Sequence, residues 1–135
     1  MLRSLSGLMA LALGVLMTTA PALSAQATTP TEPVRHIVVF KYKAGASEEQ
    51  VRQVTEAFAA LRTKIPGIVS FEHGVNNSPE KLNQGFTHVY QVTFTSAAAR
   101  DAYLPHPAHK EFGELLGRLG VLEGVFVVDY APVRD

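Results

Sequence analysis

Two strand-like segments, one near each end of the chain, are apolar on both faces, and this pattern limits the possible folds more than any other feature. In RHIVVFKY (35–42), one face includes Val38 and Phe40, and the other includes Ile37. In VFVVDY (125–130), apolar residues again fill consecutive positions. An antiparallel sheet with one face in water alternates apolar with polar residues. Both faces of a sheet built from these strands therefore need cover.

The segments between these strands predict an α+β fold. Capping residues, apolar stripes at three- and four-residue spacing, and proline or glycine stops mark the helices. The order β-α-β-β-α-α-β is that of a ferredoxin-like split βαβ fold, with helices on one face of an antiparallel sheet. The predicted elements are strands at 35–42, 68–75, 86–94 and 125–130, and helices from Ser47 to about Lys64, from Ser96 to Leu104 and from about Pro107 to Leu119.

The second face of the sheet predicts self-association. Helices on one side leave the other apolar face uncovered, and the chain has no second domain to cover it. Another copy of the same sheet is the simplest cover, and two-fold dimers are the commonest oligomers. We therefore expect a homodimer.

The N-terminal segment has the composition of a secretory signal peptide. Residues 1–27 carry one charge, at Arg3, then an apolar run from Leu8 to Met17 and an A-x-A site at 25–27. That run is too short to span a bilayer. We therefore expect export to the periplasm or the extracellular space, with no membrane association after cleavage.

Composition narrows the function of the remaining chain, which we divide into a linker at 28–33 and one domain at 34–135. Without residues 1–27 the chain has 11 basic and 12 acidic residues, and no basic cluster that would favour nucleic acid. It contains no cysteine, so it forms no disulfide and has no thiolate metal ligand. Nucleic acid is therefore not an expected partner.

The segment YLPHPAHKEF (103–112) concentrates groups suited to acid/base chemistry. Pro107 favours the first position of a helix, which makes His106 its N-cap and places His109 in its first turn. The positive end of the helix dipole there favours a neutral imidazole, which can accept a proton. Tyr103 supplies a phenol that can donate to a developing oxyanion.

Two further histidines suggest a pocket. His36 and His88 lie near the starts of two predicted strands and share faces with apolar residues, as the polar groups at the mouth of an apolar cavity would. The catalytic candidates are Tyr103 and His109. The predicted pocket residues are His36, Val38, Phe40, His88, Tyr90, Val92, His106 and Phe112.

A second interpretation of Tyr103, His106 and His109 is structural. These side chains could hydrogen-bond backbone groups left free by the prolines at a corner between two helices. A three-histidine metal site is the less favoured chemistry, because HExxH and related motifs are absent. The sequence therefore predicts neither a metal nor a cofactor.

Four segments resemble the stress-responsive A/B barrel (Dabb) family over residues 34–132. They are VRHIVVFKYK, GFTHVYQVTF, YLPHPAHKEFG and VVDYAP. The resemblance implies a ferredoxin-like protomer that dimerises sheet to sheet into an α+β barrel. In the family's plant polyketide cyclases, which perform aldol condensation without metal or cofactor, the acid/base pair corresponds to Tyr103 and His109. The strand histidines of their pocket correspond to His36 and His88.

The expected function is binding of a small apolar or aromatic ligand, with cyclase- or lyase-like acid/base chemistry as the expected reaction. Two alternatives stay open. One is a non-catalytic, stress-protective dimer, and the other is haem binding or monooxygenation on a dimeric barrel. The chain also departs from the cyclases at Pro105, where they have an apolar residue, and at the glycine-rich segment 117–124.

Overall fold

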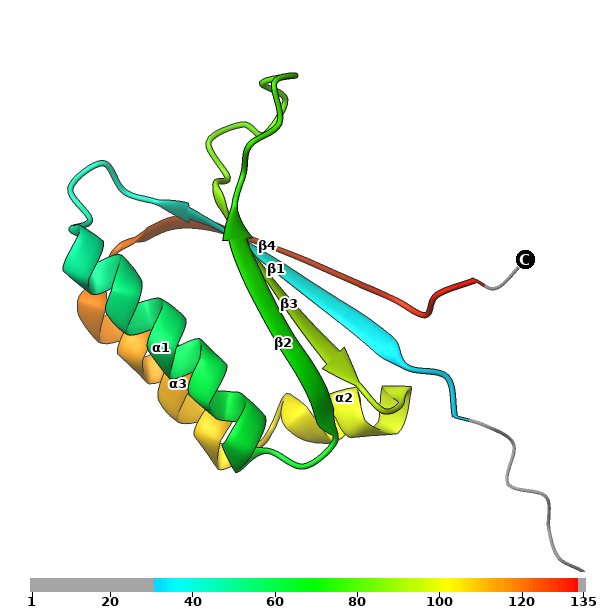
Figure 1. The fold of residues 1–135 in the computed structure, drawn as a ribbon. Helices are drawn as coiled ribbons and strands as arrows, with labels where there is room; N and C mark the ends of the chain where they lie inside the picture. The colour runs from blue at the N-terminus through cyan, green and yellow to red at the C-terminus, as the bar shows by residue number, and fades with distance from the viewer. Residues whose placement is uncertain (1–30, 134–135) are drawn as a thin grey trace, which may run out of the picture.

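The computed structural model describes residues 31–133, so the predicted signal peptide lies outside the described residues. The predicted α+β order is confirmed (Figure 1). The elements are β1 (Val34–Tyr42), α1 (Glu48–Lys64), β2 (Ile68–Val75), β3 (His88–Phe94), α2 (Ala97–Tyr103), α3 (Pro107–Leu119) and β4 (Leu122–Tyr130). Within this range, none of the helices has the length and apolar character needed to cross a bilayer.

Two strand boundaries differ from the prediction. The third strand begins at His88 rather than residue 86, because the chain before it is a turn in which Phe86 N–H donates to the Asn83 carbonyl (2.8 Å). The last strand begins at Leu122 rather than residue 125. Gly124 pairs with Lys41, and the register shift between Lys41 and Tyr42 accommodates the longer strand.

The sheet has the strand order β2-β3-β1-β4, and each neighbouring pair is antiparallel. Strand β1 is therefore paired on both sides. Helices α1 and α3 pack side by side across one face, and α2 lies at the end of the sheet where β1 begins (Figure 1). The opposite face carries no helix from the described part of the chain.

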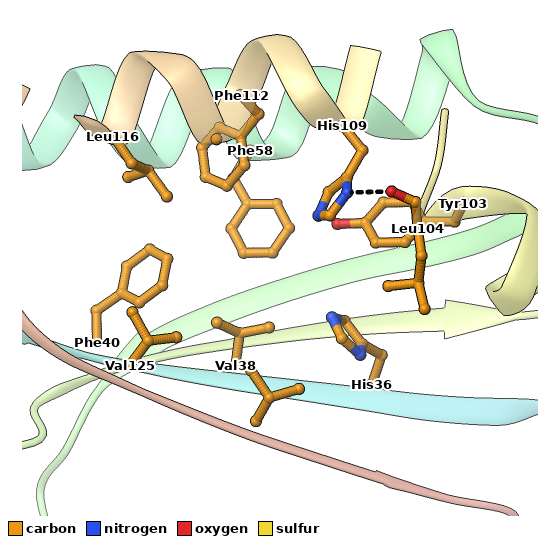
Figure 2. Close-up of a pocket in the computed structure, with 12 residues that line it drawn as sticks. His36, Val38, Phe40, Phe58, Tyr103, Leu104, His109, Phe112, Leu116 and Val125 are labelled. Carbon is orange, nitrogen blue, oxygen red and sulfur yellow. Dashed lines mark hydrogen bonds between the residues drawn. The ribbon is translucent and has the colours of Figure 1, made fainter. Parts of the chain in front are cut away.

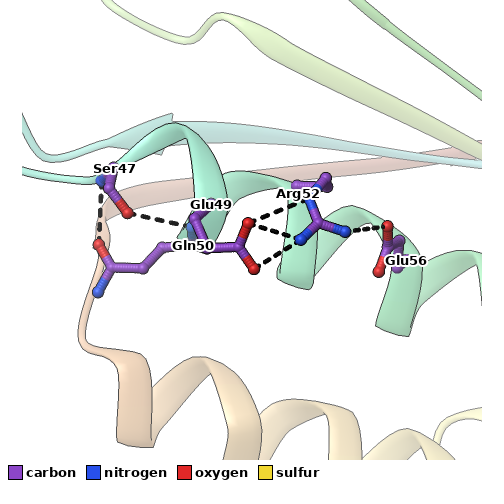
Figure 3. A network of polar contacts seen from close by, with 5 residues as sticks. All are labelled: Ser47, Glu49, Gln50, Arg52 and Glu56. Carbon is purple, nitrogen blue, oxygen red and sulfur yellow. Dashed lines mark hydrogen bonds and ion pairs between the residues drawn. The ribbon is translucent and has the colours of Figure 1, made fainter.

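Helix α1 begins as its sequence predicts. The Ser47 hydroxyl accepts from Gln50 N–H (3.2 Å), and the Gln50 side chain accepts from Ser47 N–H (3.0 Å), which completes a capping box (Figure 3). On the solvent side, Arg52 bridges Glu49 and Glu56. The opposite side presents the apolar stripe to the sheet, with Phe58 buried among aromatic rings from β1, β2, β3 and α3.

The uncovered sheet face is apolar in the middle of β1 and along the neighbouring part of β4. Phe126 pairs with Val39 and Val128 pairs with Ile37, so these side chains share that face. Phe126 remains 53% exposed and Val128 43% exposed. The strands are thus apolar on both faces, as expected, and no helix or strand of residues 31–133 covers one of these faces.

Two fully buried tyrosines differ in how their hydroxyl groups are satisfied. The Tyr90 hydroxyl lies 2.8 Å from Thr55 Oγ1 and 3.2 Å from the Tyr42 hydroxyl. Tyr103 is 0% exposed, and its hydroxyl has no hydrogen-bond partner within residues 31–133. A buried polar group without a partner destabilises the fold, so the Tyr103 hydroxyl contributes nothing to stability.

We expect the two tyrosines to respond oppositely to loss of the hydroxyl. Tyr103→Phe should leave the free energy of unfolding unchanged or raise it by about 1 kcal/mol, because it removes a group with no partner. Tyr90→Phe should lower it by about 1–2 kcal/mol, because two hydrogen bonds are lost. Urea denaturation followed by circular dichroism measures both. A loss in Tyr103→Phe as large as that in Tyr90→Phe would contradict this account.

Candidate functional site

A cavity of about 230 Å³ lies between helix α3 and the covered face of the sheet (Figure 2). Its polar end is formed by His36, Tyr103 and His109. Val125 and Val127 line it from β4 yet are about half exposed, so the cavity is accessible from the β4 side. The remaining lining residues are apolar or glycine: Val38, Phe40, Phe58, Leu104, Phe112, Gly113 and Leu116.

Tyr103, the last residue of α2, points its hydroxyl group into the polar end of this cavity (Figure 2). Its ring centroid lies 4.2 Å from that of His109 and 5.7 Å from that of His36. Burial, and then the negative charge of Asp129, raise the pKa of Tyr103 above its ordinary value. Tyr103 is therefore a phenol at neutral pH, with a proton available for donation.

His109 is oriented by one ring nitrogen and presents the other to the cavity. Its Nδ1 lies 3.0 Å from the Leu104 carbonyl oxygen, which can only accept, so Nδ1 carries a proton. In the neutral ring, Nε2 then has a free lone pair. Figure 2 shows this nitrogen turned toward the cavity. The structural interpretation accounts for the Nδ1 bond but not for the position of Nε2.

His106 has the structural role. It is the N-cap of α3, and its Nδ1 accepts from the Ala108 N–H at 3.1 Å, as its position before Pro107 predicted. Its side chain does not line the cavity, so the prediction that His106 is a pocket residue is wrong for this cavity. Of the two histidines in the H-P-x-H element, one therefore begins the helix and the other faces the cavity.

His36, on β1, is buried and bonded to a carboxylate that the sequence analysis missed. Its Nδ1 lies 2.6 Å from Asp129 Oδ1, and the other Asp129 oxygen accepts from Arg100 of α2. His36 and Asp129 are direct partners in the β1–β4 ladder. Their contact follows from the strand register, for which the sequence contains no local signal.

His88 lies outside this cavity, contrary to the expectation that His36 and His88 border one pocket. Both are near the starts of their strands, but β1 and β3 are antiparallel, so the two starts are at opposite ends of the sheet. Val92 pairs with His36, whereas His88 pairs with Phe40. His88 packs against Tyr42 with ring centroids 4.8 Å apart. Burial, and then the charge of His73, lower its pKa.

The other predicted pocket residues divide in the same way. Val38, Phe40 and Phe112 line the cavity, whereas Tyr90 and Val92 are buried in the core and do not reach it. Among the lining residues not predicted, Val125 and Val127 lie opposite Phe40 and Val38 in the β1–β4 ladder, a register that no local sequence signal gives. The remaining unpredicted lining residues are Phe58, Leu104, Gly113 and Leu116.

The described residues hold no group of three or more histidine, aspartate or glutamate side chains arranged to bind a metal ion. The histidines that face the cavity, His36 and His109, are each bonded through Nδ1 to a protein group. The arrangement instead places a hydrogen-bond donor, Tyr103, beside the imidazole rings of His36 and His109 at one end of an apolar space. Such a site can bind a carbonyl oxygen and transfer a proton on an adjacent atom.

Known proteins have sequences similar to that of this chain. The profile of the family described as Stress responsive A/B Barrel Domain (Dabb) matches residues 34–132. The stress-response A/B barrel domain-containing protein HS1 of Arabidopsis thaliana is 38% identical over 100 residues, which cover 74% of this chain and 90% of that protein. Olivetolic acid cyclase of Cannabis sativa is 29% identical over 99 residues, covering 73% of this chain and 96% of the cyclase.

Solved structures agree with these matches. The hydroxynitrile lyase of Passiflora edulis superposes with a TM-score of 0.70 at 30% identity, covering 78% of this chain and 98% of the lyase. A dimeric ferredoxin-like protein of unknown function from Jannaschia sp. CCS1 superposes with a TM-score of 0.63 at 26% identity, covering 74% of this chain and 99% of that protein. The chain belongs to the stress-responsive A/B barrel (Dabb) family.

Proposed function

We propose that this protein binds a small apolar carbonyl compound in the cavity and catalyses proton transfer on it without a cofactor. One observation carries the proposal. Within residues 31–133, the fully buried phenol of Tyr103 has no hydrogen-bond partner, and it faces the same apolar cavity as Nε2 of His109. Native proteins seldom bury an unsatisfied hydroxyl group, and such a group calls for a functional explanation. A carbonyl oxygen is the acceptor that would satisfy it.

The chemistry follows from the two groups. Nε2 of His109 takes a proton from the carbon next to the carbonyl, and the electron pair moves onto the carbonyl oxygen. The Tyr103 hydroxyl donates a hydrogen bond to that developing oxyanion, and the imidazolium later returns a proton. A positioned base contributes about 10²–10⁴-fold to such a step, and one oxyanion donor about 10²–10³-fold. The raised pKa of Tyr103 keeps its proton in place throughout.

The apolar walls support a small substrate. Phe58 and Phe112 lie with ring centroids 4.7 Å apart, and Phe40 packs near them at the end of the cavity away from His36. The volume of about 230 Å³ corresponds to roughly eight water molecules, which suits a single ring or a short chain. Exclusion of water strengthens the hydrogen bonds at the polar end.

The relatives' names agree with chemistry at a carbonyl carbon. A hydroxynitrile lyase, by its name, cleaves a hydroxynitrile, which releases a carbonyl compound. The cyclase resemblance implies an aldol condensation, which begins with removal of a C–H proton next to a carbonyl, whereas cleavage of a hydroxynitrile removes its O–H proton. A base and an oxyanion donor at one end of an apolar cavity serve both reactions.

Hydrogen–deuterium exchange on acetophenone tests the proposal without knowledge of the natural substrate. In D₂O, the wild-type protein should accelerate exchange of the methyl protons, followed by NMR. His109→Ala should lower that rate by about 10²-fold or more, and Tyr103→Phe by about 10²-fold. His88→Ala is the matched control, because His88 lies outside the cavity, and its rate should remain within about twofold of wild type.

Two outcomes would contradict the assignment. Exchange in the wild type no faster than in buffer would favour the non-catalytic, stress-protective function. An equal loss in His88→Ala and His109→Ala would show that proton transfer does not occur in this cavity.

We also propose that the protein is a homodimer formed through the uncovered sheet face. Phe126 and Val128 are about half exposed on that face, and Tyr130 of the same strand is 49% exposed. Burial of such side chains stabilises association by about 25 cal/mol per Å² of apolar area. The Jannaschia relative, described as dimeric, has the same fold.

Light scattering tests the dimer. The mature wild-type protein at micromolar concentration should have about twice its chain mass. Phe126→Lys places a charge on the uncovered face and should produce monomer or aggregate. Val133→Lys, at a position already 91% exposed beyond the sheet, should leave the mass unchanged. A monomeric wild type would overturn the proposal.

Export is the third part of the proposed function, and it rests on residues 1–27. Their apolar run and the A-x-A site match a secretory signal peptide. Mass spectrometry of the protein recovered from the periplasm or medium of a bacterial expression host should give a chain that begins at about Thr28. A full-length chain beginning at Met1 and found only in the cytoplasm would contradict export.

A further inference from the structure

We propose that Asp129 is a positioning residue that fixes His36 as a second hydrogen-bond acceptor at the polar end of the cavity. The site would then select a carbonyl compound with a hydroxyl group on the neighbouring carbon. This inference rests on the proposed function and names its substrate class. It starts from a carboxylate that the proton-transfer step itself does not use.

The contact with Asp129 sets the tautomer of His36. Its ring is 6% exposed, and Nδ1 lies 2.6 Å from Asp129 Oδ1. A carboxylate accepts hydrogen bonds and does not donate them, so Nδ1 carries the proton in this pair. In the neutral ring Nε2 then has the lone pair, and Figure 2 shows this outer nitrogen pointing up into the cavity.

Arg100 holds the Asp129 carboxylate in place. Arg100 donates to its second oxygen and also binds Asp101 at 2.7 Å. A guanidinium is always a donor, so both Asp129 oxygens act as acceptors, one for Arg100 and one for His36. The three residues come from α2, β1 and β4, and the β1–β4 register sets His36 opposite Asp129. The imidazole is therefore held in one orientation and one tautomer.

The polar end of the cavity has more hydrogen-bond acceptors than donors. The polar end of the cavity offers one donor, the Tyr103 hydroxyl, and two acceptors, Nε2 of His109 and Nε2 of His36. A simple ketone occupies Tyr103 and presents its acidic C–H to His109, but leaves His36 without a donor. A hydroxyl group beside the carbonyl supplies that donor. A site built to bind a substrate hydroxyl discriminates against the analogue that lacks it.

Three matched ketones measure this preference by titration calorimetry. They are 2-hydroxy-1-phenylethanone, acetophenone, and 2-methoxy-1-phenylethanone, whose ether keeps the oxygen but has no donor. The wild-type protein should bind the hydroxy ketone roughly tenfold more tightly than either of the others, the scale of one additional hydrogen bond in a buried site.

Asp129→Asn should abolish the preference for the hydroxy ketone while the cavity still binds ketones. Arg100 would take the single amide oxygen, so the amide N–H₂ would face His36 Nδ1 and force the proton onto Nε2. The hydroxy ketone should then bind no better than its methyl ether, because the Nε2–H of His36 donates to either oxygen. In the ¹⁵N NMR spectrum of the imidazoles, His36 should change from the Nδ1–H to the Nε2–H tautomer.

Asp101→Asn is the matched control, because Asp101 also pairs with Arg100 but does not contact His36. It should change neither the hydroxyl preference nor the His36 tautomer. His36→Phe keeps a ring in this space and removes both nitrogens, so it tests the same preference even if Asp129→Asn does not fold. The hydroxy ketone and acetophenone should bind His36→Phe with equal affinity.

The outcomes separate this inference from the proposed function. Equal wild-type affinity for the hydroxy ketone and acetophenone, with binding still dependent on Tyr103, would overturn the inference and leave the proposed function intact. Retention of both the preference and the tautomer in Asp129→Asn would overturn the role of Asp129. Absence of binding by all three ketones would overturn both proposals.

Discussion

The antiparallel pairing of β1 with both β3 and β4 is the constraint on which the rest of the structure depends. It places one row of β1 side chains beneath the helices and the other row on the uncovered face. In the covered row, His36 lies opposite Asp129 of β4 and is hydrogen-bonded to it. Phe40 lies opposite His88 of β3, near the other end of the sheet. A shift of one residue would exchange the two faces and separate His36 from its carboxylate. The register therefore determines both the core and the polar end of the cavity.

The corner between α2 and α3 serves stability and chemistry with neighbouring residues. His106 begins α3 by accepting from Ala108 N–H, and the Leu104 carbonyl orients His109. The structural and functional interpretations of this segment are therefore not exclusive, because His109 uses one nitrogen for each. The buried hydroxyl group of Tyr103 has no hydrogen-bond partner in the described residues, so it lowers the stability of the fold locally. Functional sites commonly retain such a cost in stability.

Several features could be predicted because each depends on residues close together in the sequence. They are the order of helices and strands, the capped starts of α1 and α3, and the apolar stripe of α1. Ser47 is an example, since its partner Gln50 lies three positions along the chain. Tyr103 and His109 could be predicted to lie close together for the same reason. Local signals could not show whether His36 and His88 border the same pocket. Their relative positions depend on the directions of β1 and β3, which are antiparallel.

The sequence by itself determined the fold class, the two-sided apolar strands and the closeness of Tyr103 to His109, since these follow from local spacing. Only the tertiary structure decided that Asp129 faces His36, that His88 lies at the far end of the sheet, and that His109 turns Nε2 toward an apolar cavity. The physical reason is that strand pairing brings together residues more than ninety positions apart, as in the His36–Asp129 contact. No periodicity within a single segment records which residue will be the partner.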